Sequence, residues 1–258
     1  MNVLQELKRF YLRFKGEKGI IGFTEKGAPI PYFAVKKSAY PVIIVQYAIH
    51  AREYITTYLA LKQIKEFDKN GKHGSVLFIP AVNIDGIAIA LNCNPLYKAN
   101  ANGVDLNVNF PARWGTGKSN VKVRGDMNYI GKRPFSESET NALRHFTIKK
   151  RPTATISYHS KGEEVYWEFF QRGNIRERDY LLGKKISEVT GYKLKSTPDS
   201  AGGYKDWCVE SLRIPAYTIE VGNDDLSHPI GKEHLKSIFL KNRKVIFEVT
   251  EYLWKKNS

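Results

Sequence analysis

The chain has few cysteines and no long uninterrupted stretch of apolar residues. With only Cys93 and Cys208 among 258 residues it cannot build a disulfide framework, and neither cysteine belongs to a CxxC pair. No segment is long and apolar enough to span a bilayer, so we expect no membrane partner. Internal repeats and low-complexity segments are also missing. These absences favour a compact globular protein over a disulfide scaffold, a membrane protein or a repeat array.

Acidic residues are scarce as well. The sequence has 26 Asp and Glu against 41 Lys and Arg, a formal net charge of +15. Such an excess attracts anions of many kinds, among them nucleic acid and acidic wall polymers. The basic residues, however, are scattered in short groups without an aromatic–basic repeat, so we expect no dedicated nucleic-acid module. Nucleic-acid binding driven by net charge alone would weaken steeply with added salt.

Residues 1–15 are predicted to form an N-terminal helix, because their apolar side chains recur at helical spacing. These side chains are Leu4, Leu7, Tyr11 and Phe14. Charged residues interrupt the same stretch, which therefore has no apolar signal core and predicts a cytoplasmic protein. A location outside the cell or at the cell wall would require processing or another export route. The length and a hydrophobic content of 42% suit one domain over residues 1–258.

Segments of strand and helix character alternate along the chain. Expected strands cover residues 31–36, 40–49, 76–82, 153–158, 164–170 and 216–221. Expected helices cover residues 52–68, 136–150, 176–190 and 231–255. Ser136 and Glu139 resemble a capping box that opens the second of these helices. The alternation is typical of an α/β sheet covered by helices on both faces. Beyond Asn83, a loop over about 92–135 is long enough to suggest a functional role.

Polar side chains stand at the ends of three expected strands. His50 and Glu53 follow one strand, His159 follows another, and Glu220 ends a third. The carboxyl ends of strands form the ligand-binding edge of an open α/β sheet, so these side chains are expected to converge. A spacing of three places His50 and Glu53 on one face of a helical turn. Two imidazoles and a carboxylate are a donor set used by open catalytic zinc sites.

Each of these signals is weak when it stands alone, because an HxxE pair or a histidine at a strand end is more often structural. Six motifs that occur in a fixed order strengthen the prediction of a metal site. They are HAREYI (50–55), PAVNIDG (80–86), GVDLNVNF (103–110), YHSKG (158–162), GGYKDW (202–207) and YTIEVG (217–222). Together they extend across most of the chain and resemble the metallocarboxypeptidase family. The related deacylase branch reads HGNE instead of HARE and lacks GVDLN, so the peptidase branch fits better.

The resemblance implies a carboxypeptidase-like catalytic domain over residues 1–258. Its sheet is expected to be mixed, mainly parallel and twisted, with about eight strands and helices on both faces. One zinc ion per chain would be held by His50, Glu53 and His159, with a peptide or muropeptide as substrate. Asp105 in GVDLN would hold the second ring nitrogen of His50 and so fix its tautomer. A turn residue is the alternative reading of this aspartate.

The remaining functional assignments also come from the resemblance. Glu220 corresponds to the general base, which takes a proton from the attacking water and later delivers one to the leaving amine. Lys98, upstream of GVDLN, is the candidate cation for the developing oxyanion. Arg52, Asn107 and Ser160 are candidate substrate contacts. For Arg52, an exposed arginine at a helix start is the structural alternative.

Departures from the family pattern bear on the substrate. Val108 replaces the arginine that grips a free C-terminal carboxylate beside Asn107, and Pro198 falls where the family has a mobile tyrosine. Valine cannot form the bidentate charge-assisted pair that a carboxylate favours, which puts ordinary exopeptidase recognition in doubt. Lys205 stands at the position that sets side-chain specificity. A cation there suits a substrate that carries a further carboxylate.

Residues 200–222 look like the corresponding part of bacterial γ-D-glutamyl-diamino-acid endopeptidases, which cut peptidoglycan stem peptides. We therefore expect cleavage of a γ-D-Glu–diamino-acid bond. Two alternatives stay open. The first is a metallocarboxypeptidase for ordinary or acidic-ended peptides, which the retained Asn107 and Arg52 favour. The second is a non-catalytic binder of anionic wall fragments, against which the presence of all three metal ligands and Glu220 argues.

Overall fold

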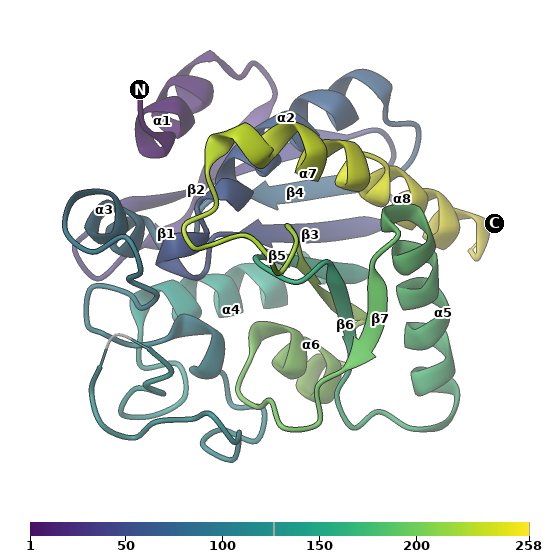
Figure 1. Ribbon diagram of the computed structural model, residues 1–258. Coiled ribbons are helices and arrows are strands. Elements are labelled where there is room, and N and C mark those ends of the chain that lie inside the picture. Colours follow the sequence, from purple (N-terminus) through teal and green to yellow (C-terminus); the bar gives the residue numbers. More distant parts are fainter. Residues whose placement is uncertain (126, 258) are drawn as a thin grey trace.

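The computed structural model describes residues 1–125 and 127–257. Within them, one eight-stranded sheet runs in the order β1-β2-β4-β3-β5-β8-β6-β7 (Figure 1). The strands are β1 (Glu17–Phe23), β2 (Pro29–Lys36), β3 (Val42–Tyr47), β4 (Ser75–Ile79), β5 (Ala154–His159), β6 (Glu164–Glu168), β7 (Lys193–Ser196) and β8 (Ala216–Glu220). The central strands β4, β3, β5 and β8 are parallel, and antiparallel pairings occur toward the two sides. The sheet is thus mixed and mainly parallel, as predicted.

Helices cover both faces of this sheet, which confirms the predicted α/β class. They are α1 (Val3–Arg13), α2 (Ile55–Asn70), α3 (Ile84–Asn92), α4 (Ser138–Lys150), α5 (Gly173–Thr190), α6 (Tyr204–Leu212), α7 (Leu235–Asn242) and α8 (Val245–Lys255). Helices α1, α2, α5, α7 and α8 pack on one face, and α4 and α6 pack on the other. Figure 1 shows α2 and α7 above the sheet and α4 and α6 below it.

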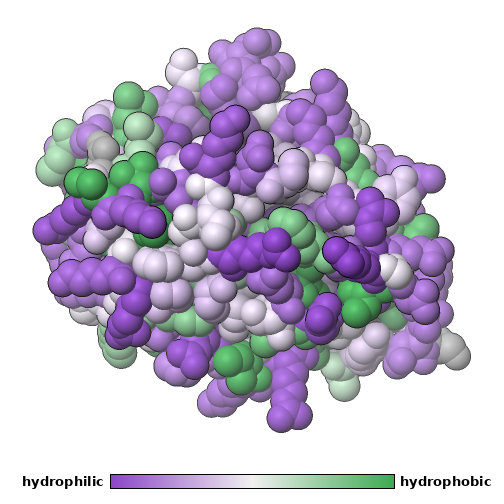
Figure 2. Space-filling model, turned by 90° about the horizontal axis from the view of Figure 1, so that it is seen from below, coloured by the Kyte–Doolittle hydropathy of each residue, from purple (hydrophilic) through white to green (hydrophobic). Residues whose placement is uncertain are grey.

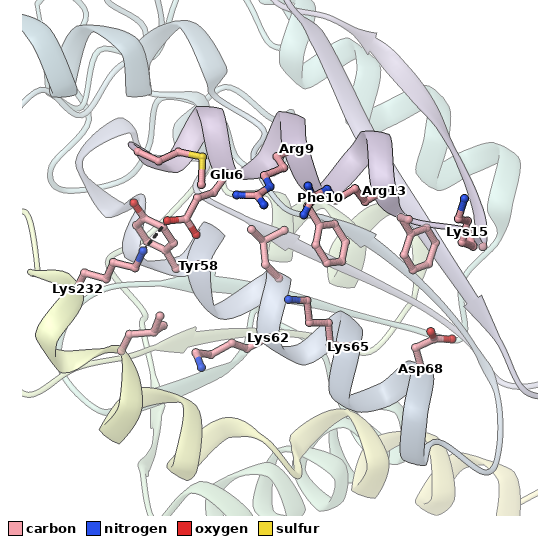
Figure 3. Close-up of a pocket in the computed structure, with 15 residues that line it drawn as sticks. Glu6, Arg9, Phe10, Arg13, Lys15, Tyr58, Lys62, Lys65, Asp68 and Lys232 are labelled. Carbon is pink, nitrogen blue, oxygen red and sulfur yellow. Dashed lines mark hydrogen bonds and ion pairs between the residues drawn. The ribbon is translucent and has the colours of Figure 1, made fainter.

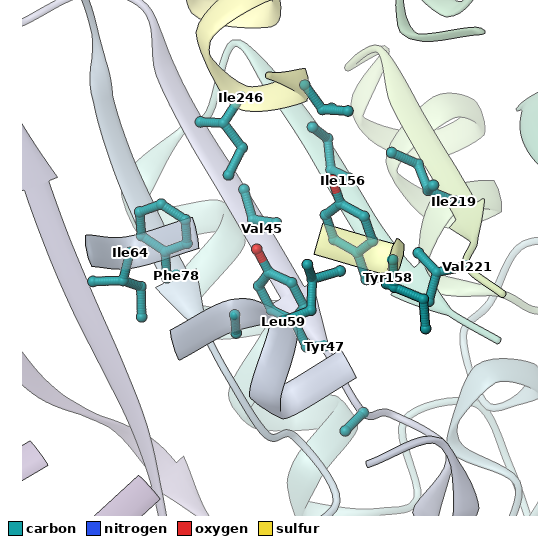
Figure 4. Close-up of a cluster of buried hydrophobic side chains, with 14 of the residues drawn as sticks. Val45, Tyr47, Leu59, Ile64, Phe78, Ile156, Tyr158, Ile219, Val221 and Ile246 are labelled. Carbon is teal, nitrogen blue, oxygen red and sulfur yellow. The ribbon is translucent and has the colours of Figure 1, made fainter. Parts of the chain in front are cut away.

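Alternating side chains of the central strands build two separate cores. In β3, Val45 and Tyr47 belong to the core shared with α2, α5 and α8, part of which is drawn in Figure 4. Ile44 belongs to the second core, shared with α4 and α6. Because both faces are covered, the central strands are almost continuously apolar. At their carboxyl ends, alternation turns His159 and Glu220 toward the second face, since Tyr158 and Ile219 just before them lie in the first core.

The surface is mostly hydrophilic on the face drawn in Figure 2. Apolar residues there form small separate patches among charged and polar ones. Small scattered patches of this kind are normal for a globular protein surface. In the part of the chain that the structure describes, no helix is both long enough and apolar enough to cross a membrane.

Several elements escaped the sequence interpretation. α3 occupies the stretch that we expected to open a loop, and the side chain of Asn83 caps its first turn by accepting a hydrogen bond from the Gly86 amide at 3.0 Å. β1, β7 and α6 were not predicted either. β7 has only four residues and is largely exposed, so its sequence carries little apolar periodicity. The single helix expected over 231–255 is split into α7 and α8.

The predicted capping box before α4 is wrong. The helix begins at Ser138 with Glu137 as its N-cap residue, and the Glu137 side chain makes no cap hydrogen bond. The Ser138 amide donates to the Glu25 carboxylate at 2.6 Å. The Ser136 hydroxyl instead donates to the Glu137 carboxylate, and Glu139 turns inward to accept a hydrogen bond from Asn100 at 3.2 Å. The expected motif failed because its acidic member serves a tertiary contact, which local spacing does not reveal.

A buried polar network joins α2 to the two strands that precede the site histidines. Gln63 accepts a hydrogen bond from the Tyr47 hydroxyl at 2.6 Å and donates to the Tyr158 hydroxyl at 3.0 Å. It also donates to the Asn242 carbonyl in α7 at 3.0 Å. The two tyrosine rings are stacked, with their centroids 5.0 Å apart, as Figure 4 shows. The amide thus satisfies polar groups that water cannot reach.

Replacing Gln63 with leucine is expected to lower the free energy of unfolding by about 2–4 kcal/mol, because it leaves two tyrosine hydroxyls buried without partners. Urea unfolding followed by circular dichroism measures this. The double variant Tyr47→Phe/Gln63→Leu should lose less unfolding free energy than the sum of the losses in the two single variants. Additive losses would contradict the network.

Candidate metal centre and active site

The site lies where the parallel strands β3 and β5 end side by side. His50 follows β3 and starts a short 3-10 helix, η1 (Ala51–Glu53), which carries Glu53. His159 is the last residue of β5, which pairs directly with β3. The register of the sheet therefore brings residues 109 positions apart in the chain to the same edge.

The metal-binding atoms of these three side chains meet. His50 Nδ1 lies 2.8 Å from Glu53 Oε1 and 3.2 Å from His159 Nδ1. Glu53 Oε2 lies 3.1 Å from His159 Nδ1, and all three residues are buried. Ligands at about 2.0–2.1 Å from a tetrahedral zinc ion lie roughly 3.3 Å from one another. Two imidazoles, a carboxylate and these spacings fit a zinc ion with a position left open for water.

The charges of the site support a cation at this point. Burial acts to raise the pKa of Glu53, but the adjacent His50 and His159 hold it well below its usual range. For His50, burial acts to lower the pKa, and the carboxylates of Glu53 and Asp105 more than offset this and raise it. The pocket is therefore built around an ionised carboxylate that demands positive charge beside it.

Asp105 and Lys98 form a second layer around His50. The Asp105 carboxylate lies 3.1 Å from His50 Nε2, and a hydrogen bond there would leave Nδ1 free to face the cluster. The other oxygen of Asp105 lies 2.7 Å from the Lys98 ammonium, which also donates to Asn128 at 2.9 Å. Lys98, paired with Asp105, holds the pKa of that carboxyl far below its usual range against the effect of burial. The candidate oxyanion cation is thus anchored at the site.

Glu220 stands next to His159 across the sheet. β8 is parallel to β5, with the Cα atoms of His159 and Glu220 paired in register. Oε2 of Glu220 is buried and has no hydrogen-bond partner among the described residues. Burial, helped by the Glu53 charge, raises the pKa of Glu220 to about 8, against the opposing effect of His159 and Lys98. A carboxyl group with a pKa near neutrality is suited to accept and return protons at pH 7.

A cleft of 520 Å³ opens at this centre. It is lined by His50 just after β3, by Lys98 from the loop after α3, and by Asp105, Asn107 and Val108 of the 103–110 motif. The loops around it contribute Gly117, Ser119, Asn120, Asn128 and residues 196–201. The cleft therefore offers many hydrogen-bonding groups and an apolar side chain, Val108, where the family pattern has a guanidinium.

Two of the other predicted substrate contacts, Arg52 and Ser160, directly neighbour candidate metal ligands in the chain. Arg52 is in η1, and its guanidinium reaches the Met127 sulfur at 3.8 Å. The Ser160 amide donates to Glu53 Oε2 at 3.3 Å, and its hydroxyl is buried without a partner in the described chain. The side chain of Asn107 accepts a hydrogen bond from the Tyr204 amide at 3.2 Å. Ser160 thus supports a metal ligand directly, and Asn107 ties the cleft to α6.

Lys205 does not line the 520 Å³ cleft. Its ammonium lies 2.6 Å from Asp206 Oδ1 and 3.0 Å from the Glu168 carbonyl, and the side chain is buried over the Phe169 ring. A neighbouring cavity of 240 Å³ is lined by Glu168 and Phe169 and shares residues 196–198 with the cleft. Any substrate carboxylate that reaches the Lys205 ammonium competes with Asp206 for the ion pair.

Two further residues near the site were missed from the sequence. Asn128 binds Lys98 from the long loop, where nothing in its local sequence marks it as special. His228 lies in the loop after β8, and its Nδ1 atom is buried without a partner in the described chain. Burial, with Arg52 and Lys161, lowers the pKa of His228, so the ring is neutral at pH 7. The neighbouring residues, Ser227 and Pro229, form no motif with His228 that would have identified it as a site residue.

Zinc binding is expected to displace a proton from Glu220. With a pKa of about 8, this carboxyl group is protonated in roughly nine of ten metal-free molecules at pH 7, and the added charge of a cation favours the ionised form. Glu220→Gln should therefore release about one proton fewer per zinc ion at pH 7. Calorimetric titrations of zinc in buffers of different ionisation enthalpy measure the number of protons released per zinc ion bound.

At pH 9.5 the difference should vanish, because the wild-type carboxyl group is then ionised before zinc binds. Glu251→Gln, on the exposed surface of α8, is the matched control and should release as many protons as the wild type. Equal proton release by Glu220→Gln and wild type at pH 7 would show that Glu220 is ionised without metal.

Comparisons with known proteins agree with this geometry. The profile of the zinc carboxypeptidase family matches residues 15–254. A γ-D-glutamyl-L-diamino acid endopeptidase 1 from Lysinibacillus sphaericus is 26% identical over 90% of this chain and 66% of its own length. Metallocarboxypeptidase A from Trichophyton tonsurans is 30% identical over 66% of this chain and 44% of its own length. This chain is thus shorter than the curated relatives it matches.

Solved structures share the fold at low sequence identity. Bovine thrombin-activatable fibrinolysis inhibitor superimposes with a TM-score of 0.84 at 19% identity, over 98% of this chain and 95% of that one. Murein-tripeptide amidase MpaA from Escherichia coli O157 gives 0.68 at 21% identity, over 91% and 92%. The family profile covers all eight described strands together with His50, Glu53 and His159, and this chain therefore belongs to the zinc carboxypeptidase family.

Proposed function

We propose that the protein is a zinc peptidase that hydrolyses the bond between γ-linked D-glutamate and a diamino acid in peptidoglycan stem peptides. The observation that carries the hydrolytic activity is the meeting of His50, Glu53 and His159, with Glu220 paired in register beside them. The substrate assignment is supported by the endopeptidase relative and by Val108 in the cleft.

The residues of the site divide the chemistry among them. Zinc, when bound, acts as a Lewis acid that polarises the scissile carbonyl and activates a water molecule. Glu220, ionised once a cation is bound beside it, accepts a proton from the water and returns one to the leaving amine. Lys98, held in place by Asp105 and Asn128, stabilises negative charge that develops on the carbonyl oxygen. Asp105 keeps the His50 ring in a metal-binding orientation.

The cleft composition favours an internal bond of a polar peptide over the last bond of an ordinary one. An exopeptidase needs a cation that forms a bidentate pair with the terminal carboxylate, and Val108 supplies none beside Asn107. The amide and hydroxyl groups of the surrounding loops suit a substrate rich in amides and carboxylates. A γ-linked D-glutamate also carries a free α-carboxylate; Lys205, which is buried beside Asp206 outside the cleft, is not assigned to it.

The purified, zinc-loaded protein is expected to cleave a synthetic L-Ala–γ-D-Glu–diaminopimelate–D-Ala peptide between glutamate and the diamino acid, a bond that is internal in this peptide. Mass spectrometry of the products locates the cut bond. A chelator should abolish cleavage, and Glu220→Gln should reduce it by at least about a thousandfold, because both the base and the proton donor are lost.

The Glu220→Gln variant should still bind one zinc ion, which atomic absorption on the dialysed protein checks. Intact peptide after long incubation with zinc-loaded wild type would overturn the substrate assignment. Release of C-terminal residues from ordinary peptides in the same assay would favour the carboxypeptidase alternative. A cleaving Glu220→Gln variant would overturn the role of the base.

Val108→Arg is expected to add exopeptidase activity. An arginine beside Asn107 can pair with a terminal carboxylate, and such a charge-assisted contact is worth about 1.5–3 kcal/mol. We expect kcat/KM on a blocked dipeptide with a free C-terminus to rise by roughly tenfold or more, mostly through a lower KM. The same dipeptide with an amidated C-terminus should show no gain.

Val108→Met, which adds an unbranched, uncharged side chain, is the control and should leave the kcat/KM of both dipeptides unchanged. An equal gain for Val108→Met, or for the amidated dipeptide, would mean that the added bulk and not the charge causes the effect. No gain for Val108→Arg would contradict the part that we assign to Val108 in substrate choice.

A further inference from the structure

A second large concavity lies away from the metal centre, between α1 and α2. It has a volume of 660 Å³ and shares no lining residue with the cleft at the site. Figure 3 shows α1 along one side and α2 along the other, with Lys232, which lies just before α7, at one end. We call this concavity the α1–α2 groove. Neither the family resemblance nor the proposed reaction gives it a role.

The rims of the α1–α2 groove are strongly basic. Arg9 and Arg13 are one helical turn apart on α1, and Lys62 and Lys65 are one turn apart on α2, so each pair projects on one side. Figure 3 shows the four side chains around the same opening. None of them forms an ion pair with a carboxylate of the described residues. They therefore hold like charges close together without compensation.

Acidic residues compensate little of this charge. Glu6 forms an ion pair with Lys232 at 2.5 Å and is thereby occupied. Asp68, at the far end of the α1–α2 groove in Figure 3, is the other carboxylate in the lining. Lys15 adds another cation at that end. A concave surface with this imbalance concentrates anions from solution.

The floor of the α1–α2 groove, in contrast, is apolar and aromatic. It consists of Phe10 from α1, Phe14 just after α1, Tyr58 and Leu61 from α2, and Leu235 from α7. Lys65 lies over the Phe10 ring with its ammonium 5.6 Å from the centroid, and Lys232 lies over Tyr58 at 4.4 Å. The ammonium groups of both lysines thus lie against aromatic rings of the floor, where positive charge and apolar surface meet.

We propose that the α1–α2 groove binds an acidic amphipathic segment of a partner protein, with apolar side chains on the floor and carboxylates on the two rims. Charge complementarity selects an anion, and the aromatic floor selects one that carries apolar groups. A polyphosphate or a nucleic-acid backbone would satisfy the rims but leave the floor without a match. A concave surface between two helices also fits an inserted helix or strand better than a flat membrane.

The dimensions agree with this occupant. α1 has 11 residues and is roughly 16 Å long, so about three turns of a docked helix can lie beside it. In such a helix, apolar residues at positions i, i+3, i+4 and i+7 face the floor, and acidic residues on both flanks reach the rims. Binding would cover the floor and reduce repulsion among the rim cations.

The test is a fluorescence-anisotropy titration of the intact protein with a labelled 14-residue peptide that has leucine and phenylalanine on one face and glutamate on both flanks. Arg9→Glu/Lys65→Glu should weaken binding by roughly tenfold or more, because each reversal removes an ion pair and adds a repulsion. Lys149→Glu/Lys184→Glu, an equal charge change on exposed positions elsewhere, should change the Kd less than about twofold.

Matched probes separate the two parts of the proposal. A peptide with the apolar face replaced by glutamine should bind at least about tenfold more weakly, since the floor then contributes nothing. Replacement of all glutamates by lysine should abolish binding. Peptidase activity of Arg9→Glu/Lys65→Glu on the stem peptide should equal that of the wild type, which shows that the variant is folded.

Several results would overturn the proposal. Equal binding of the glutamine-face peptide, or tighter binding of polyphosphate, single-stranded DNA or anionic lipid vesicles, would show that charge alone acts. The same loss in the Lys149→Glu/Lys184→Glu control would show a nonspecific charge effect. Concentration-dependent dimerisation that Arg9→Glu/Lys65→Glu abolishes would make a second copy of this chain the occupant.

Discussion

The ionised carboxylate of Glu53, buried between two histidines, is the group on which the site depends. Taking a carboxylate out of water is costly unless cations or hydrogen bonds surround it. Here His50 and His159 approach its two oxygens, and the Ser160 amide donates to one of them. A cation that binds at this point completes the arrangement. Burial, with a smaller contribution from the Glu53 charge, raises the pKa of the neighbouring Glu220.

The fold explains why such distant residues can meet. Parallel pairing of β3, β5 and β8 brings their carboxyl ends to one edge, and each of these strands is followed by or ends in a polar residue of the site. The two cores on either side of the sheet hold this edge rigid. Rigid placement is what metal ligands require, because misplacement by a fraction of an ångström already weakens coordination.

Much of this could be predicted from the sequence, and the limits have physical reasons. The buried central strands were recognised because parallel strands covered on both faces are continuously apolar, as in the run from Val42 to Tyr47. β7 was not, because a short exposed strand leaves no periodic signal. The convergence of His50 with His159 was expected from strand ends alone. The pairing of Lys205 with Asp206 was not, because no sequence pattern shows which neighbour a buried charge will choose.

The hydrogen-bond network of Gln63 links the three segments that carry the candidate metal ligands. Tyr47 lies three residues before His50, Tyr158 directly precedes His159, and the helix that carries Gln63 begins two residues after Glu53. Each stretch that supplies a ligand is therefore fastened to the same side-chain amide on the opposite face of the sheet. Loss of the Gln63 side chain would therefore remove a contact that the three segments share.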